Sequence, residues 1–363
     1  MDPEKKITSV YVQLAKHLDT LHVPFPSSES GVELRILKRW FTEEEASIAV
    51  AMRGRPETAS AIASRIEMTP ETLSPILEKM SKKGLIFRSS KGAHRRYHLV
   101  PLAEGMWEFH LNSIDLNDLH NLHEYFDTFF QKGWYATPTT QHRIIPVAQS
   151  LPSDLEILPY EQAESIIQGH ERIAVARCIC RKEMQMLGKG CDHPSEVCLI
   201  FDSGADFYVE NGLAREITQD EALQILKTAM DSGLVLQPGN GQKIWCICMC
   251  CSCCCMILRA LQKMERPAEV VHSNFYAQIE NAKCISCGLC EEKCPMNAIR
   301  TGSDFPEVNR NRCIGCGVCV GNCSESVIQL RQKDEQNRYV PPENAIEMTM
   351  RVLQERESQK TKV

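Results

Sequence analysis

The first 177 residues of this chain contain no cysteine, although its 363 residues together include nineteen. Long hydrophobic runs are also missing: the most apolar stretch, residues 244–258, has fifteen residues and is too short to span a bilayer. The opening residues, MDPEKKITSVYVQLAKHL, lack the uninterrupted apolar core of a secretory signal. These absences predict a cytoplasmic protein without membrane insertion.

Two nucleotide-binding patterns are missing as well. No glycine-rich dinucleotide fingerprint follows an expected strand, and no phosphate-binding P-loop occurs. We therefore expect the chain to lack a flavin, NAD or ATP site of its own. Any electrons that it carries must come from other proteins and pass to other proteins.

Cysteine is the abundant residue, and all nineteen cysteines lie between Cys178 and Cys323. Their number is odd, and a reducing cytosol does not favour disulfides. Metal ligation is therefore the better explanation of the thiols.

The strongest motif lies near the C-terminus. The pattern Cys-x2-Cys-x2-Cys-x3-Cys over residues 284–294 recurs over residues 313–323, displaced by 29 residues at every cysteine. In such a run three thiolates surround one [4Fe–4S] cube, and the fourth binds the other cube. The first cluster is then held by Cys284, Cys287, Cys290 and Cys323. The second is held by Cys294, Cys313, Cys316 and Cys319.

This region resembles bacterial-type 2[4Fe–4S] ferredoxins over about 50 residues. It departs from the common pattern at Ser324, where a proline often follows the last cysteine. Gly288, Gly315 and Gly317 allow the backbone to pass close to a cluster. Structural zinc is the alternative, but zinc commonly takes two separated cysteine pairs, and a doubled run of three does not suit it.

Eleven further cysteines lie in the middle of the chain. They are Cys178, Cys180, Cys191, Cys198, Cys246, Cys248, Cys250, Cys251, Cys253, Cys254 and Cys255. Seven thiols in ten residues have no packing explanation, so one or two further iron–sulfur clusters are expected, and buried inert cysteine is the alternative. A pair from the run 246–255 can join Cys178 and Cys180, with Cys191 and Cys198 closing another set. A helix over residues 252–261 would place thiols that are separated by one turn on the same face of the helix.

These middle cysteines resemble those of iron–sulfur proteins from strict anaerobes. Their spacing does not match the double-cysteine motif of heterodisulfide reductases. Eleven ligands fit two four-cysteine cubes with three thiols left over, or one larger cluster. The spacing of the cysteines does not distinguish between these two alternatives.

The N-terminal part predicts a different kind of domain. Helices are expected over residues 33–52 and 57–66. Thr69 is a suitable N-cap for a third helix, which ends at Gly84, and residues 85–100 are typical of two strands. This order resembles the winged-helix domains of bacterial regulators over roughly 70 residues.

A winged helix can bind DNA or dock a protein. The exposed early positions of the third helix, Glu71, Thr72 and Ser74, offer no Arg, Gln or Asn for base edges, and Pro75 interrupts its backbone donors. The wing offers more to phosphates. Its basic residues are Lys82, Lys83, Arg88, Lys91, Arg95 and Arg96. Docking is favoured, and DNA binding stays open.

The whole chain is expected to be a multidomain α+β protein. Its expected segments are 1–30, an N-terminal helix and linker; 31–105, a winged-helix-like domain; 106–159, a helical connector; 160–275, a cysteine-rich middle domain; 276–335, a ferredoxin-like two-cluster domain; and 336–363, a C-terminal helix and tail.

Three functions fit these segments. The favoured one is an electron-transfer protein or subunit that relays low-potential electrons to a partner oxidoreductase in an anaerobe, rather than a stand-alone enzyme. A second is a reductase with a substrate-reducing cluster in residues 246–255. A third is a redox-responsive winged-helix transcription regulator.

Overall fold

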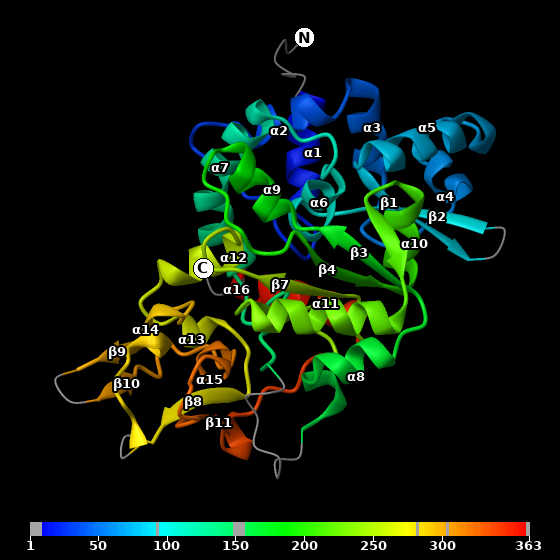
Figure 1. The fold of residues 1–363 in the computed structure, drawn as a ribbon. Helices are drawn as coiled ribbons and strands as arrows, with labels where there is room; N and C mark the ends of the chain where they lie inside the picture. The colour runs from blue at the N-terminus through cyan, green and yellow to red at the C-terminus, as the bar shows by residue number, and fades with distance from the viewer. Residues whose placement is uncertain (1–8, 92–93, 148–156, 281–282, 303–304, 361–363) are drawn as a thin grey trace. The chain divides into compact units, whose positions relative to one another are not determined.

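The computed structural model describes residues 9–91, 94–147, 157–280, 283–302 and 305–360 (Figure 1). The described chain forms two compact units. The first comprises Met1–Thr137, Asp206–Leu213 and Gln359–Val363, and the second comprises Pro138–Ala205 and Ala214–Ser358. Parts of the expected segments lie outside the described residues: residues 1–8 of the N-terminal segment, residues 92–93 of the hairpin turn, residues 148–156 of the connector, residues 281–282 and 303–304 of the ferredoxin-like domain, and residues 361–363 of the tail.

The first unit is mainly helical. Its elements are α1 (Val10–Leu18), α2 (Val32–Trp40), α3 (Glu43–Ala51), α4 (Ala59–Ala63), α5 (Pro70–Lys83), β1 (Ile86–Lys91), β2 (His94–Leu99), α6 (Trp107–Phe109) and α7 (Leu116–Phe129). Part of α10 (Asp202–Glu210) also belongs to it. The strands β1 and β2 pair antiparallel.

The single helix expected over residues 33–52 is wrong. Phe41 is extended, with φ −107° and ψ 138°, and separates α2 from α3. Thr42 caps α3 through a reciprocal pair of hydrogen bonds with Glu45, which satisfies backbone donors that a continuous helix would have paired internally. The periodicity continues across the break because both helices bury one face.

The local signals of the third helix are confirmed. Thr69 Oγ1 accepts from Thr72 N, and α5 ends at Gly84, whose φ of 89° is left-handed. An isolated bridge also pairs Glu57, which precedes α4, with Tyr97 of β2. The winged-helix interpretation of these elements stays a prediction.

The second unit contains a five-stranded antiparallel sheet in the order β5-β3-β4-β7-β6. Its strands are β3 (Ile173–Arg177), β4 (Glu196–Phe201), β5 (Ala214–Ile217), β6 (Val235–Pro238) and β7 (Cys246–Cys250). The helices around it are α8 (Ala163–Gln168), α9 (Ile179–Met186), α11 (Gln219–Asp231), α12 (Met256–Gln262) and α13 (Pro267–Val270).

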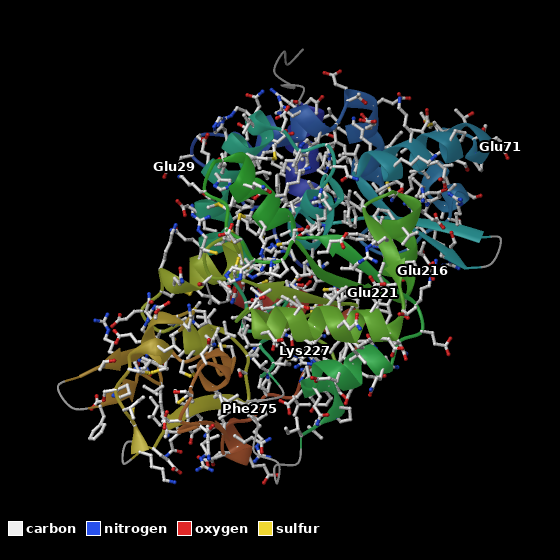
Figure 2. All side chains as sticks on the ribbon, viewed as in Figure 1. Glu29, Glu71, Glu216, Glu221, Lys227 and Phe275 are labelled. Carbon is white, nitrogen blue, oxygen red and sulfur yellow. The ribbon has the colours of Figure 1, made fainter. Side chains whose placement is uncertain are left out.

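The two faces of this sheet differ in chemistry. Ile247 and Met249 of β7 belong to the hydrophobic core that also takes in buried side chains of α8 and α11. Glu221 and Lys227 lie on the exposed side of α11 (Figure 2). Since successive side chains of a strand alternate between faces, the three cysteines of β7 lie on the face opposite this core.

The C-terminal part of the second unit repeats one small motif. The strand β8 (Phe275–Ile279), whose first residue is labelled in Figure 2, pairs with β11 (Ile328–Gln332). Between them lie α14 (Leu289–Glu292), β9 (Ile299–Thr301) paired with β10 (Pro306–Val308), and α15 (Val318–Gly321). The helix α16 (Ala345–Lys360) follows. The described chain is therefore a mixed α/β structure, and none of its helices is long and apolar enough to cross a membrane.

Candidate metal centres

The first cavity of the C-terminal repeat is lined by four thiols. Cys284, Cys287 and Cys290 come from the first repeat and Cys323 from the second. The space between the lining residues that no atom fills, open solvent included, is about 380 Å³. Ser286 N donates to Cys284 Sγ at 3.4 Å. The side chain of Cys287 is exposed, so this cavity reaches the surface.

The second cavity has the reciprocal lining. Cys313, Cys316 and Cys319 come from the second repeat and Cys294 from the first. The space between the lining residues that no atom fills, open solvent included, is about 330 Å³. Backbone amides donate to two of these sulfurs. Ala298 N lies 3.2 Å from Cys294 Sγ, and Ala277 N lies 3.4 Å from Cys313 Sγ. Donors to sulfur stabilise the negative charge of a cluster.

The exchange of the fourth thiol between repeats is the arrangement expected from the spacing. The structure brings each predicted set of four together around one cavity. Cluster ligation by these residues stays a prediction.

Backbone geometry repeats with the cysteines. Gly288 and Gly317, which are 29 residues apart, have φ of 78° and 79°. Ser286 and Gly315 are also equivalent and have φ of 50° and 66°. Only the second repeat needs glycine at this position, because a Cβ on Gly315 would lie 2.2 Å from the carbonyl oxygen of Phe275. The backbone at Gly315 thus packs against Phe275 and leaves no room for a side chain.

Burial raises the pKa of cysteine thiols in both cavities. Burial raises the pKa of the Cys316 and Cys319 thiols, both of which line the second cavity. It also raises the pKa of Cys290 in the first cavity. A buried thiolate therefore needs a compensating positive centre, which the iron of a cluster would supply.

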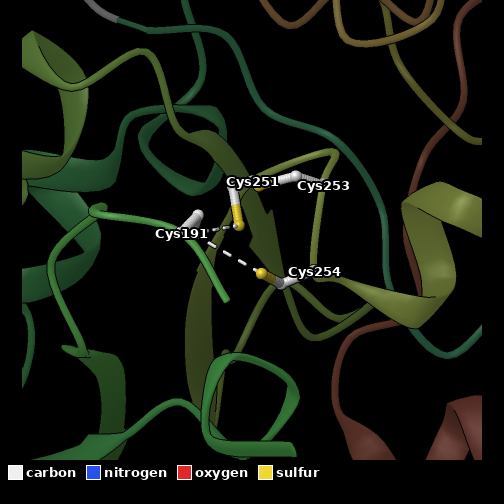
Figure 3. A group of neighbouring side chains, drawn as sticks. All are labelled: Cys191, Cys251, Cys253 and Cys254. Carbon is white, nitrogen blue, oxygen red and sulfur yellow. Dashed lines mark hydrogen bonds between the residues drawn. The ribbon is translucent and has the colours of Figure 1, made fainter. Parts of the chain in front are cut away.

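The middle cysteines form three sets. The first, called here the Cys191 group, is compact (Figure 3). It consists of Cys191, Cys251, Cys253 and Cys254, and all four sulfurs lie within 4.8 Å of one another. Cys191 Sγ lies 3.8 Å from Cys251 Sγ and 3.5 Å from Cys254 Sγ.

Two distant loops build the Cys191 group. Cys191 lies in the loop between α9 and β4, while the other three lie in the turn between β7 and α12. This turn is closed by Cys255 N, which donates to Cys251 O at 3.1 Å. The helix that could have begun at residue 252 begins instead at Met256, so the thiols of the turn converge without helical spacing.

The second set, called the Cys178 group, consists of Cys178, Cys180, Cys250 and Cys255. A hydrogen bond from the Cys180 thiol, followed in size of effect by one from the Cys250 thiol, holds the pKa of Cys255 well below its usual value. The pKa of Cys180 lies well above its usual value because its proton is shared with Cys178 and Cys255. Gln237 Nε2 also donates to Cys255 Sγ at 3.6 Å. The four sulfurs thus contact one another in series, but they do not all lie within 4.8 Å of one another.

Three thiols remain and are called the Cys198 group. Cys198 of β4 is the cross-strand partner of Cys248 in β7, and their sulfurs are 3.8 Å apart. Cys246 is in side-chain contact with Cys248, and so is Cys250 of the Cys178 group. Cys191 and Cys198, which were expected to close one set together, therefore contact different partners.

A buried cation lies beside two of these groups. Arg181 in α9 is 5% exposed, and its Nη2 donates to Met249 O at 3.1 Å. Burial alone would lower the pKa of Arg181, but the sulfurs of Cys178, Cys251 and Cys250 raise it above its usual value. The guanidinium therefore stays charged and offsets negative charge on both the Cys178 group and the Cys191 group.

Sequence reasoning missed two features of these centres. Gln237 was not identified as a donor to sulfur, and no pattern around it marks that role. The spacing of Cys246, Cys248 and Cys250 at every second residue is a strand signal that would have placed these three side chains on one face.

Comparison with known proteins identifies the C-terminal repeat. A family described as the 4Fe-4S dicluster domain matches residues 283–328. The chain is 57% identical over 28 residues to the 4Fe-4S ferredoxin FdxA of Gottschalkia acidurici, and equally to a ferredoxin of Acetoanaerobium sticklandii. Each match covers 8% of this chain and 50% of the relative, so the chain spans about half the length of the curated relatives it matches.

No solved structure matches the chain. The family match and the two cysteine-lined cavities agree in extent and in residue content. The C-terminal part of this chain is therefore an iron–sulfur ferredoxin domain of the 4Fe-4S dicluster type.

Proposed function

We propose that the chain is a multi-cluster electron-transfer protein, or a subunit of an oxidoreductase, that relays low-potential electrons in the cytoplasm of an anaerobe. The observation that carries this proposal is the pair of cavities, each lined by three thiols of one repeat and one of the other. Such sets hold cubes whose charge changes by one electron.

The exposed cavity supplies a point of contact for a redox partner. Cys287 is exposed, and the neighbouring Ile285 has 62% of its surface exposed. An apolar residue beside an exposed ligand supports docking of a redox protein at this rim, since close approach speeds electron transfer. We assign electron exchange with a redox protein partner to the first cluster.

The buried cavity is connected to the middle thiols. Gln262 Nε2 donates to the carbonyl oxygen of Pro295, which lines the second cavity, at 2.7 Å. Gln262 ends α12, and Cys255 immediately precedes this helix. Seven helical residues rise about 10 Å. This short path supports passage of electrons between the second cluster and a further cluster in the Cys178 group.

The first unit is proposed as the docking module. Its helices, its hairpin and the Glu57–Tyr97 bridge support a winged helix. Three of the basic residues expected to contact phosphates form ion pairs within the unit. Lys83 Nζ lies 2.6 Å from Glu45, while Arg88 and Arg95 both contact Glu78. These pairs leave fewer charges for phosphates and favour a protein partner over DNA.

One observation favours a second candidate function, that of a reductase. Only three thiols belong to the Cys198 group alone, and the fourth thiol in contact with them, Cys250, is shared with the Cys178 group. A cluster held by three cysteines would leave one iron open to a substrate. Titration with thiols or acyl thioesters tests this candidate, because binding at an open iron changes the electron paramagnetic resonance (EPR) spectrum and unchanged spectra reject it.

The electron-transfer proposal is tested by iron and acid-labile sulfide per chain after anaerobic purification, followed by a reductive EPR titration. Two ferredoxin cubes give about eight iron atoms, and a further cube in the Cys178 group gives about twelve. We expect about twelve, with several one-electron centres. Colourless protein, or zinc in place of iron in the ferredoxin domain, would reject the proposal.

The regulator alternative is tested separately. A specific DNA-binding protein would retain a duplex at about 50 mM salt in the presence of bulk competitor DNA. We expect no retention that depends on sequence. A duplex preferred over competitor would replace docking with transcriptional control as the role of the first unit.

A further inference from the structure

The Cys191 group differs in size from the cluster sites of the same molecule. Among the residues that the structure describes, it is the one group of three or more potential ligands whose ligand atoms all lie within 4.8 Å of one another. The eight cysteines of the ferredoxin domain contain no set this compact, although they line two cavities. The structure thus holds the ferredoxin thiols apart around a cavity and the Cys191 group in contact.

This difference has a direct geometric meaning. Four thiolates on one tetrahedral ion, with bonds of about 2.3 Å, have their sulfurs about 3.8 Å apart. The Cys191–Cys251 and Cys191–Cys254 sulfur pairs are separated by 3.8 Å and 3.5 Å. In a cube each thiolate binds a different iron atom, so the sulfurs must stand farther apart. The Cys191 group has the size of a single ion.

We propose that Cys191, Cys251, Cys253 and Cys254 bind one tetrahedral zinc ion. Zinc sites with four cysteines are closed and structural, because no coordination position remains for a substrate. This ion does not change its charge and carries no electron. It ties the loop before β4 to the turn after β7, and these segments are 60 residues apart.

The surroundings suit an ion held by thiolates. Cys251 and Cys254 have the C-x2-C spacing common in zinc sites. The amide of His193 donates to Cys191 Sγ, and that of Cys254 donates to Cys251 Sγ. Such donors orient ligands and reduce the charge of a tetrathiolate site. The imidazole of His193 is not required as a ligand, since four thiols are already present.

The Cys191 group is shielded from solvent on one side and reaches solvent on the other. Cys251 and Cys254 are buried in the hydrophobic core of the sheet, with 4% and 0% of their surfaces exposed. Cys253 is exposed and leaves a route to solvent. Arg181 supplies a positive charge next to Cys251. Two alternatives, inert buried thiols and a disulfide between Cys191 and Cys254, are outcomes of the test.

The test measures zinc directly. The full chain is purified anaerobically from cells supplied with both iron and zinc, and zinc, iron and sulfide are determined per chain. We expect one zinc ion in addition to the iron. X-ray absorption at the zinc edge should show four sulfur neighbours at about 2.3 Å.

A matched pair of variants locates the ion. The double substitution Cys191→Ser and Cys254→Ser should remove the zinc and keep the EPR signals of the ferredoxin domain. The control Cys198→Ser alters a middle cysteine outside the group and should keep the zinc. Zinc that persists in the double variant overturns the proposal, as does a loss of about four iron atoms with their sulfide in place of zinc.

The wild-type measurement decides the case even where the double variant does not fold. Wild-type protein without zinc, with fewer than four sulfur neighbours, or with a disulfide between Cys191 and Cys254, overturns the proposal. Failure of the electron-transfer function would appear separately, as missing ferredoxin iron, so the two proposals fail independently.

Discussion

The ferredoxin domain and the middle sheet are both rich in cysteine, but they arrange their thiols in opposite ways. In the ferredoxin domain, turns between short elements hold four sulfurs around each cavity. In the middle region, sulfurs from two strands, two loops and a helix terminus contact one another directly. The number of cysteines therefore says little about the kind of metal centre, because the spacing of the sulfurs decides it.

The largest expected effect separates the two regions by metal. Cys319→Ala removes a buried thiol that lines the second cavity and is the predicted ligand there, so about four iron atoms and their sulfide should be lost per chain. Zinc in the Cys191 group should remain. Metal analysis and EPR of the anaerobic protein check this outcome. Loss of both metals would show that the two regions are not independent.

A second prediction tests the close backbone packing at Gly315. Gly315→Ser introduces the residue that the first repeat has at position 286, but its Cβ would meet the Phe275 carbonyl oxygen at 2.2 Å. We expect a loss of roughly 2–5 kcal/mol in the free energy of unfolding, with reduced iron content. Anaerobic thermal denaturation with iron analysis measures both.

The control for this prediction is Gly288→Ala in the first repeat. Gly288 has φ of 78°, and a Cβ added to it would have no atom within 4 Å, so only backbone strain of about 1–2 kcal/mol is expected. Equal losses in the two variants would mean that strain, and not the close backbone contact, controls both positions.

A smaller effect is expected from the charge shared by the middle groups. Arg181→Met removes the buried cation beside Cys178 and Cys251, so metal should be released to a chelator about tenfold more readily. Arg181→Lys keeps the charge and should restore most of the retention. Anaerobic competition with a chromophoric chelator measures it. If Arg181→Lys behaves like Arg181→Met, packing and not charge is the role of this residue.

The smallest effect concerns the departure from the ferredoxin pattern. Ser324 is exposed, whereas the equivalent Pro295 is buried in the first repeat. Ser324→Pro should change the free energy of unfolding by no more than about 1 kcal/mol in the stabilising direction, by restricting the unfolded chain. Thermal denaturation of the anaerobic protein checks this. Loss of iron would show that the second repeat needs the freedom that serine allows.

Local signals in the sequence were sufficient where one short segment determines the structure. Thr69 and Gly84 bound α5 because capping depends on neighbouring backbone groups. The break at Phe41 was missed because the helices on both sides of it bury residues at helical spacing. The Thr42 capping box in fact marks it.

The sequence by itself determined the ferredoxin domain. Its cysteines lie in two runs of about a dozen residues each, so their spacing is a local property of the chain. Only the tertiary structure divided the eleven middle thiols, because their partners lie up to about 75 residues apart and are joined by strand pairing and a long turn. Strand register, which depends on packing of the whole sheet, decides which sulfurs meet.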